Sequence, residues 1–308
     1  MPMEGVEVAQ HADILRYDEL LAIVKAGINL GITKVKVTGG EPFVRKDVIS
    51  FLRQLKEIPE LDSVTVSTNG ILLHPYIEEL QNIGIDGINI SLDSLSPKRY
   101  HELTGFDLVH TVLENIRKLI DVTSIPVKIN AVPMNIGSIH TGTRDRMDLL
   151  STFQQDPVHI RFIEMMPIGY GKQYQVVSED IIKQEISEHF GELTPCYETL
   201  GNGPSSYYSL DGFAGKIGFI SAVSHKFCET CNRVRLSSLG HLQTCLQYDE
   251  GCDLKSVLRG DQTQELTKVM EHAIYGKPKE HIFTVWQEAE KGRELYHTNQ
   301  NIMSHIGG

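Results

Sequence analysis

The sequence predicts an α/β fold built as part of a β/α barrel. Five short β-branched runs alternate with amphipathic helical patterns along the first half of the chain. Polar residues follow nearly every one of these runs. The composition, 41% apolar and 22% charged, is typical of a globular protein, and 308 residues suffice for one large domain or for a domain with an appendage.

The strands and helices of this half are defined by their hydrophobic periodicity. Leu20, Leu21, Val24 and Ile28, for example, fall on one face at helical spacing. The expected strands are Lys34–Val37, Ser63–Val66, Ile88–Leu92, Val127–Val132 and His159–Ile163. The expected helices are Asp18–Leu30, Asp47–Lys56, Tyr76–Ile83, Val109–Ile120 and Arg146–Phe153. Strands that alternate with helices of this length predict βαβ units and a parallel sheet.

The polar residues at the strand ends favour a barrel over a doubly wound sheet. They are Gly39 to Glu41, Ser67 to Asn69, Ser91, Asp93 and Glu164, at or just past the ends of successive strands. A barrel collects its active site from the carboxyl ends of many strands, whereas an open sheet concentrates it at one switch point.

The pattern changes after about residue 170. A further helix, Glu179–Phe190, is followed by the linker Gly201–Ser206 and by strand-like segments at Tyr207–Leu210 and Lys216–Ser221. A charged helical tail begins at about Asp253. We therefore expect a partial barrel over residues 1–205 and a C-terminal antiparallel β plus helical module over residues 206–308.

Charge and composition exclude several classes of function. The 29 Lys and Arg residues against 40 Asp and Glu residues give a net charge of −11, which argues against a general nucleic-acid binder. No run approaches the roughly 20 apolar residues that cross a bilayer, and the N-terminus does not read as a signal peptide. We therefore expect a cytoplasmic protein without a membrane partner.

The cysteines point to metal binding rather than to disulfides. Cys228 and Cys231 form a C-x-x-C turn, Cys245 follows, and the total of five is odd. Structural zinc requires a fourth ligand, for which Cys252, His225 and His241 are the candidates. An iron–sulfur cluster on three thiolates leaves one iron open to a substrate. Arg233 and Arg235 alternate just beyond Cys231 and are suited to binding an anion beside the metal.

Several motifs in the same order resemble one enzyme family. They are Thr38–Asp47 (TGGEPFVRKD), Thr68–Gly70, Asn89–Asp93, Val127–Asn130, Ile160–Met166, Phe227–Ser238 (FCETCNRVRLSS) and the terminal Ile306–Gly308. Together they resemble the radical S-adenosylmethionine GTP 3',8-cyclases, the molybdenum cofactor biosynthesis protein A family. TGGEP alone marks only the wider superfamily, whereas the C-x-x-C-x-R-x-R run with a Gly-Gly terminus is more specific.

The resemblance implies a reaction and a set of partners. The family converts GTP to (8S)-3',8-cyclo-7,8-dihydroguanosine 5'-triphosphate with S-adenosylmethionine, and a cyclic pyranopterin monophosphate synthase handles the product. The resemblance is also compatible with a homodimer of this protein. The open alternatives are another radical enzyme with an auxiliary iron–sulfur cluster, such as a peptide-modifying one, and a non-catalytic GTP- or metal-binding remnant.

One family motif has no counterpart in this sequence. Relatives carry Cys-x-x-x-Cys-x-x-Cys after their first strand, usually followed by Met-Pro, and this sequence begins with Met1, Pro2 and Met3. We therefore expect a barrel that lacks its first strand and shows five parallel strands where relatives show six. We also expect no support for the second 4Fe-4S cluster and no activity of the chain as given, whether the short N-terminus is natural or a start-site error.

The resemblance also assigns roles to individual residues. S-adenosylmethionine would contact Gly39, Gly40, Glu41, Ser91 and Met166. GTP would contact Lys36, Ser67, Lys128, Arg233, Val234 and Arg235. The C-terminal 4Fe-4S cluster would be held by Cys228, Cys231 and Cys245, and Arg233, Arg235, Gly307 and Gly308 would act in catalysis.

Simpler structural roles compete with some of these assignments. Gly39 to Glu41 also fit a tight strand-to-helix turn, and Arg161 and Glu164 an internal ion pair. Cys196 and Cys252 are expected to be small apolar residues.

Overall fold

A curved sheet forms the centre of the molecule. The computed structural model describes residues 10–136, 139–140, 142–173, 175–260 and 265–283. Within them the main sheet has the strand order β1-β2-β3-β4-β7-β11-β10-β9. These strands are β1 Lys34–Val37, β2 Ser63–Thr68, β3 Gly87–Ser91, β4 Val127–Ala131, β7 Val158–Ile163, β11 Ile217–Ile220, β10 Ser206–Ser209 and β9 Thr194–Cys196.

The parallel part of this sheet is larger than the sequence predicted. All five expected strands form and pair in parallel, which confirms the α/β fold with a parallel sheet. The expected number of five parallel strands is wrong, because β11 adds a sixth by pairing with β7 from Ile160 to Ile163. The long connection through β9 and β10 hides this strand from a reading of the β/α alternation. In the described residues β1 and β9 are the two edges of the sheet.

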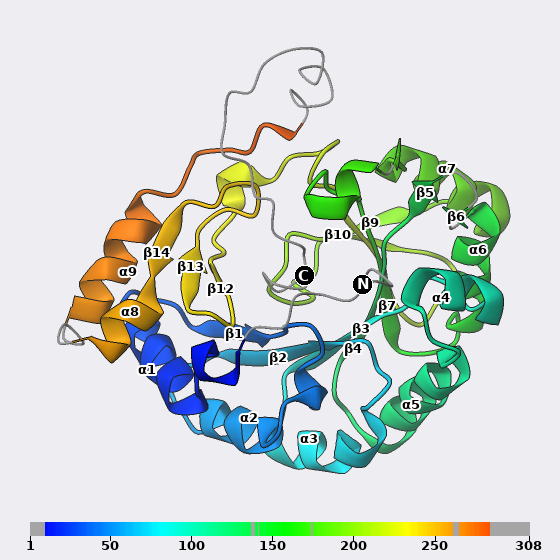
Figure 1. Cartoon of the computed structure of the whole chain (residues 1–308). Coiled ribbons are helices and arrows are strands. Elements are labelled where there is room, and N and C mark those ends of the chain that lie inside the picture. The colour runs from blue at the N-terminus through cyan, green and yellow to red at the C-terminus, as the bar shows by residue number, and fades with distance from the viewer. Residues whose placement is uncertain (1–9, 137–138, 141, 174, 261–264, 284–308) are drawn as a thin grey trace.

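Helices cover the outer side of the curved sheet (Figure 1). They are α1 Tyr17–Ile28, α2 Val48–Lys56, α3 Ile77–Ile83, α4 Pro97–Thr104, α5 Val109–Val122, α6 Thr143–Thr152 and α7 Glu179–Phe190. The sequence did not predict α4, because most of its side chains are polar and give no apolar stripe. It begins where the Ser96 side chain accepts from the Arg99 backbone N–H and Pro97 takes the first helical position.

The two faces of the sheet differ in polarity. Val64, Val66, Ile90 and Ile129 have no exposed surface and pack toward the helices. The alternate residues of the same strands are mostly polar. Register pairs Lys36 with Thr65, Ser67 with Asn89, Asn89 with Lys128, Lys128 with His159 and Asn130 with Arg161. Because side chains alternate along a strand, these polar residues share the concave face.

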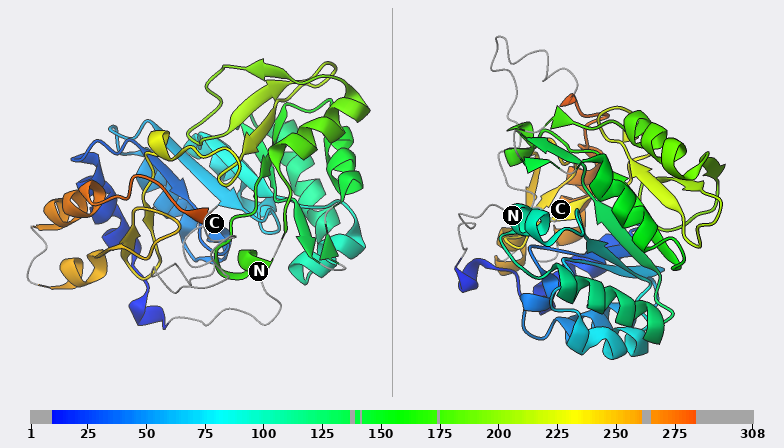
Figure 2. Two further views of the ribbon diagram at one scale, coloured as in Figure 1. Left: turned by 90° about the horizontal axis from the view of Figure 1, so that it is seen from above. Right: turned by 90° about the vertical axis from the view of Figure 1, so that its right-hand side faces the viewer.

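A second module packs at the β1 end of the sheet, against α1 (Figures 1 and 2). It contains an antiparallel sheet and two helices: β12 Arg235–Leu236, β13 His241–Gln243, β14 Gly251–Asp253, α8 Leu254–Arg259 and α9 Leu266–Tyr275. Its core joins Leu15 and Ile23 to Leu242 and Met270. The Glu19 carboxylate receives a hydrogen bond from Arg259 Nε at 2.7 Å, and this contact fixes the module on α1.

Short elements complete the fold. A small sheet that the sequence did not predict contains β5 Met134–Ile136, β6 Ile139–His140 and β8 Gln175–Val176. In the described part of the chain, 3-10 turns cover His11–Asp13, Pro42–Val44, His74–Tyr76, Gly169–Gln173 and Cys228–Thr230. No helix in the described ranges has the length and apolar character needed to span a bilayer.

Candidate functional site

A group of cations gathers on and beside the concave face. Lys36, Lys128 and Arg161 come from β1, β4 and β7, and Arg233 and Arg235 come from the cysteine segment. The charges of the other four side chains all lower the pKa of Lys36, so these five residues lie in one electrostatic environment. We call these five residues the cation cluster.

Burial and mutual repulsion perturb the cluster. Burial first, and then the charges of the other four cations, lower the pKa of Lys36 to about 7. Within the described residues its side chain is nevertheless exposed to solvent. Burial, followed by the charge of Arg161, lowers the pKa of Lys128 to about 8. Among the described residues, the main causes that shift either pKa are burial and the charges of other cations, so the site favours an anionic ligand.

Arg161 is buried and oriented by two amides. Its Nε donates to Asn130 Oδ1 at 2.8 Å, and its Nη2 donates to Asn89 Oδ1 at 2.6 Å. The expected ion pair with Glu164 is wrong: the Glu164 carboxylate accepts from the backbone N–H groups of Val223 and Ser224 at 2.6 and 2.9 Å. The two side chains lie three positions apart on an extended segment, and so they point to opposite faces.

The linker between β9 and β10 covers the amino ends of the strands on the concave face. Lys128 Nζ donates to the Leu200 carbonyl, and Asn202 Nδ2 donates to Ser63 Oγ at 2.8 Å. Gly201 in this linker has φ +136°, a backbone conformation that favours glycine. The hydrogen bonds to Lys128 and Ser63 place the linker at the floor of the site.

The TGGEP segment is a structural turn. Glu41 Oε1 accepts from the Thr68 hydroxyl at 2.8 Å and from the Phe43 N–H at 3.1 Å, and Glu41 Oε2 accepts from the Asn69 N–H at 2.7 Å. Burial raises the pKa of this carboxyl. Glu41 thus joins the loop after β1 to the loop after β2, and both oxygens already have partners.

The other residues assigned to the two small molecules occupy varied positions. Gly39 and Gly40 have open space around them, and Ser91 is exposed where β3 ends. Ser67 lies on the concave face, next to Asn89 in register. Met166 packs against Ile168 and Val223. Val234 is partly buried and packs against the core shared with α1.

The three cysteines of the window are free and half-buried. Burial raises the pKa of Cys245, and the charges of Cys228 and Cys231 raise it further. The pKa of Cys231 is lowered by its hydrogen bond with the Arg233 backbone and by the charges of Arg233 and Lys277, against the effect of burial. Burial lowers the pKa of Arg235 to about 10, while the charges of Cys231 and Cys245 act to raise it.

This donor set fits an iron–sulfur cluster in its chemistry. Thiolates are the ligands such clusters use, and the cations next to Cys231 favour the thiolate form. As they stand, no three His, Cys, Asp or Glu side chains in the described ranges are grouped to hold a single metal ion. The assignment of the cluster to Cys228, Cys231 and Cys245 therefore remains a prediction.

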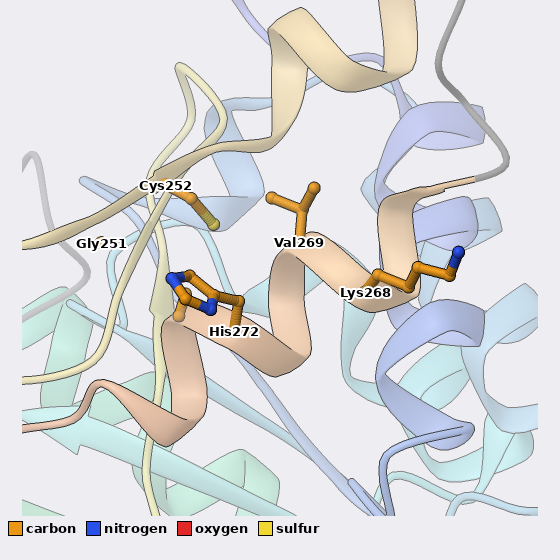
Figure 3. A pocket seen from close by; sticks show the side chains of 6 residues that line it. Gly251, Cys252, Lys268, Val269 and His272 are labelled. Carbon is orange, nitrogen blue, oxygen red and sulfur yellow. The ribbon is translucent and has the colours of Figure 1, made fainter.

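The candidate fourth ligands for zinc have other contacts. His241 Nε2 is 3.0 Å from the Asp249 carbonyl, and His225 Nδ1 is 3.8 Å from the Glu179 carboxylate. Cys252 contacts the C-terminal core, and burial raises the pKa of its thiol. It lines a pocket of about 260 Å³ between β14 and α9 with His272 and Val269 (Figure 3), and no residue of the cation cluster is among the residues that line it.

Sequence reasoning missed part of this site. Asn89, Thr65 and His159 face the concavity, and the strand register is the signal that finds them, because each is paired with a predicted residue. Lys277, which contacts Cys231, lies 46 positions away and belongs to no motif that we identified. Gly307 and Gly308, like Met1 to Met3, lie outside the described residues.

Comparison with known families and structures agrees with the fold. The Radical SAM superfamily profile matches residues 7–137, and the Molybdenum Cofactor Synthesis C profile matches residues 158–283. The crystal structure of Streptococcus suis SuiB bound to S-adenosylmethionine superposes with a TM-score of 0.51 and 14% identity. The match covers 85% of this chain and 60% of that one, and it shows a shared fold alone.

Curated relatives identify the family. A GTP 3',8-cyclase of Clostridium perfringens (strain SM101 / Type A) is 37% identical over 92% of this chain and 86% of its own length. One of Alkaliphilus oremlandii (strain OhILAs) is 37% identical over 100% of this chain and 92% of its own length. These matches confirm the resemblance read from the motifs: the chain belongs to the GTP 3',8-cyclase family of the Radical SAM superfamily.

Proposed function

We propose that this protein binds GTP and cyclises it between the ribose and C8 of the guanine, as the name of its relatives indicates. The observation that carries the proposal is the cation cluster: five positive side chains share one environment next to three free thiols. A triphosphate supplies the negative charge that this environment favours.

The protein's own residues bind and orient the substrate in this proposal. Lys36, Arg233 and Arg235 hold the phosphates, and Lys128 supplies charge near the floor. Arg161 is too constrained by Asn89 and Asn130 to reorient, so it presents a fixed guanidinium. The concave face excludes water from one side of the substrate. In the family, S-adenosylmethionine and a 4Fe-4S cluster on the Cys-x-x-x-Cys-x-x-Cys motif supply the radical chemistry. This sequence contains no counterpart of that motif, and the cluster proposed on Cys228, Cys231 and Cys245 would leave one iron open to the substrate instead.

The proposed cofactor sites follow the strand ends and the cysteine segment. Gly39, Gly40, Glu41, Ser91 and Met166 contact S-adenosylmethionine in this proposal, and Cys228, Cys231 and Cys245 hold the C-terminal cluster. The functional division is between residues 1–205 and residues 206–308, although β10 and β11 continue the main sheet. We interpret the curved sheet as part of a β/α barrel. The product would pass to a cyclic pyranopterin monophosphate synthase.

Removing the paired arginines tests the nucleotide site. In anaerobically reconstituted protein, Arg233→Ala/Arg235→Ala should bind GTP about 10- to 100-fold more weakly by calorimetry, because charge-assisted hydrogen bonds are lost. The iron content should stay unchanged. Arg53→Ala, an exposed arginine of α2, is the matched control. Wild-type GTP affinity in the double variant would remove these arginines from the site.

A further inference from the structure

The segment after α9 contacts the C-x-x-C loop through one side chain. Lys277 Nζ donates to the carbonyls of Cys231 and Arg233, both at 2.8 Å, and lies 3.4 Å from Cys231 Sγ as a third hydrogen bond. An ammonium has three donors, so these contacts use all of them. We call Lys277–Ile282 the strap.

The other end of the strap contacts the loop that follows Cys245. The Ile282 N–H donates to Gln247 Oε1 at 2.6 Å, and the Tyr248 hydroxyl donates to the Glu280 carbonyl at 3.5 Å. Gln247 is only 3% exposed, so water does not replace this contact readily. The strap therefore joins the two loops that carry the three cysteines.

A third contact links the strap to the residues that lead into Cys228. Lys226 Nζ donates to the Glu280 carboxylate and to the His281 carbonyl, both at 3.3 Å. His281 is 7% exposed and stacks on Phe283, with ring centroids 4.3 Å apart. Because of this packing, the strap has a fixed position from which Lys277 can act.

We propose that Lys277 is a positioning residue for the cysteine site, acting on both the backbone and the sulfur of Cys231. It fixes the backbone between Cys231 and Arg233, so the spacing of a thiol and a cation-cluster arginine depends on one amine. Its N–H···S bond withdraws negative charge from a ligand sulfur. Such bonds raise the reduction potential of a bound cluster, because the reduced form carries more negative charge. This inference rests on the proposed role of the three cysteines.

Four variants separate these effects. Lys277→Met removes the donors and keeps the length of the stem, Lys277→Gln keeps a neutral donor, and Lys277→Arg keeps the cation. Lys279→Met removes an exposed charge from the same strap and is the matched control. Thermal unfolding checks that each variant folds, and Lys277→Gln replaces Lys277→Met if the latter does not.

The first readout needs no cluster. In the apoprotein, amide hydrogen exchange over residues 228–235 should be faster in Lys277→Met than in wild type, and Lys279→Met should match wild type. Lys277→Arg should restore most of the protection. Wild-type exchange in Lys277→Met would overturn the backbone role.

The second readout concerns the reconstituted protein. Iron loss to a chelator should be roughly 10-fold faster in Lys277→Met. The reduction potential of the cluster in Lys277→Met should be more negative than in wild type, while that in Lys277→Arg should stay nearer to the wild-type value. An unchanged potential would overturn the role of the sulfur contact. If wild-type protein takes up no iron, the proposed cluster fails, and the exchange experiment still decides the backbone role.

Discussion

Lys36 on β1 lies in the same electrostatic environment as Arg161 on β7, although β2, β3 and β4 lie between their strands. Neighbouring strands are about 4.8 Å apart, so four steps across a flat sheet would separate the two by roughly 19 Å. The curvature of the sheet brings them closer (Figure 1). The cation cluster is thus a product of the sheet's shape rather than of any one motif.

GTP affinity should fall steeply as salt rises. In the proposed site the cation cluster attracts the phosphates through charge, and salt screens charges that are exposed to water. Titration with GTP at increasing KCl should show this loss, while guanosine, which has no phosphates, should bind with little salt dependence. Equal salt dependence for the two ligands would contradict a phosphate site at the cluster.

GTP binding should take up protons near pH 8. The pKa values of Lys36 and Lys128 in the free site are lowered to about 7 and about 8, so both amines are partly neutral there. A bound polyanion favours their charged forms, and the affinity should therefore fall as pH rises from 7 to 9. Calorimetry in two buffers of different ionisation enthalpy measures the uptake; equal heats in both buffers would refute it.

Lys36→Met should stabilise the ligand-free protein at pH 7 and weaken GTP binding. The pKa of Lys36 is about 7 in the folded chain, below its ordinary value of 10.5. Between about pH 7 and pH 10.5 the unfolded chain therefore binds more protons than the folded chain, and the free energy of unfolding rises with pH across this range. The stabilisation by Lys36→Met should be largest below pH 7 and disappear toward pH 10. Lys25→Met, at an exposed position on α1, is the control. Its thermal unfolding should match that of wild type at each pH, and its GTP affinity should be unchanged.

Glu19→Gln should loosen the C-terminal module from α1. The hydrogen bond from Arg259 is the main cause that lowers the pKa of Glu19 to about 2, and its carboxylate is buried. A depressed carboxyl pKa stabilises the fold above about pH 4.5, and this contribution is lost as the pH falls through 2. Unfolding by urea at pH 7 should show a loss of roughly 2 kcal/mol. The difference from wild type should shrink in acid, and a constant difference would argue against the ion pair.

Iron binding should depend on three cysteines and not on the other two. Cys228→Ser, Cys231→Ser and Cys245→Ser should each lose iron after anaerobic reconstitution, because hydroxyls are poor ligands for iron in these clusters. Cys196→Ser and Cys252→Ser should retain it, since Cys252 lies in the core beside α9. Metal analysis that finds zinc at one per chain would contradict the cluster.

The sequence predicted the part of the fold that repeats locally. Strands β1 to β4 and β7 combine apolar periodicity with a helix after each turn, so short windows suffice to find them. β11 was assigned to the later module because its partner, β7, lies more than 50 residues away. The pairing of β11 with β7 depends on the folded sheet and not on local propensity.

Local sequence patterns also predicted only part of the candidate site. Lys36, Lys128, Arg233 and Arg235 were predicted to contact GTP through the family resemblance, and this role stays a prediction. The structure adds that they share one electrostatic environment. The expected pairing of Arg161 with Glu164 was wrong because sequence proximity does not decide which face of a strand a residue occupies. Asn89 and Asn130, the true partners of Arg161, come from two other strands.

The linker from Leu200 to Ser205 contains no recognisable motif, yet its bonds to Lys128 and Ser63 set how deep a ligand can enter the concavity. Lengthening or shortening this loop would change the room left for a phosphate tail while leaving every charged side chain in place. In the proposed GTP site, discrimination among mono-, di- and triphosphates would therefore depend on the length of this loop.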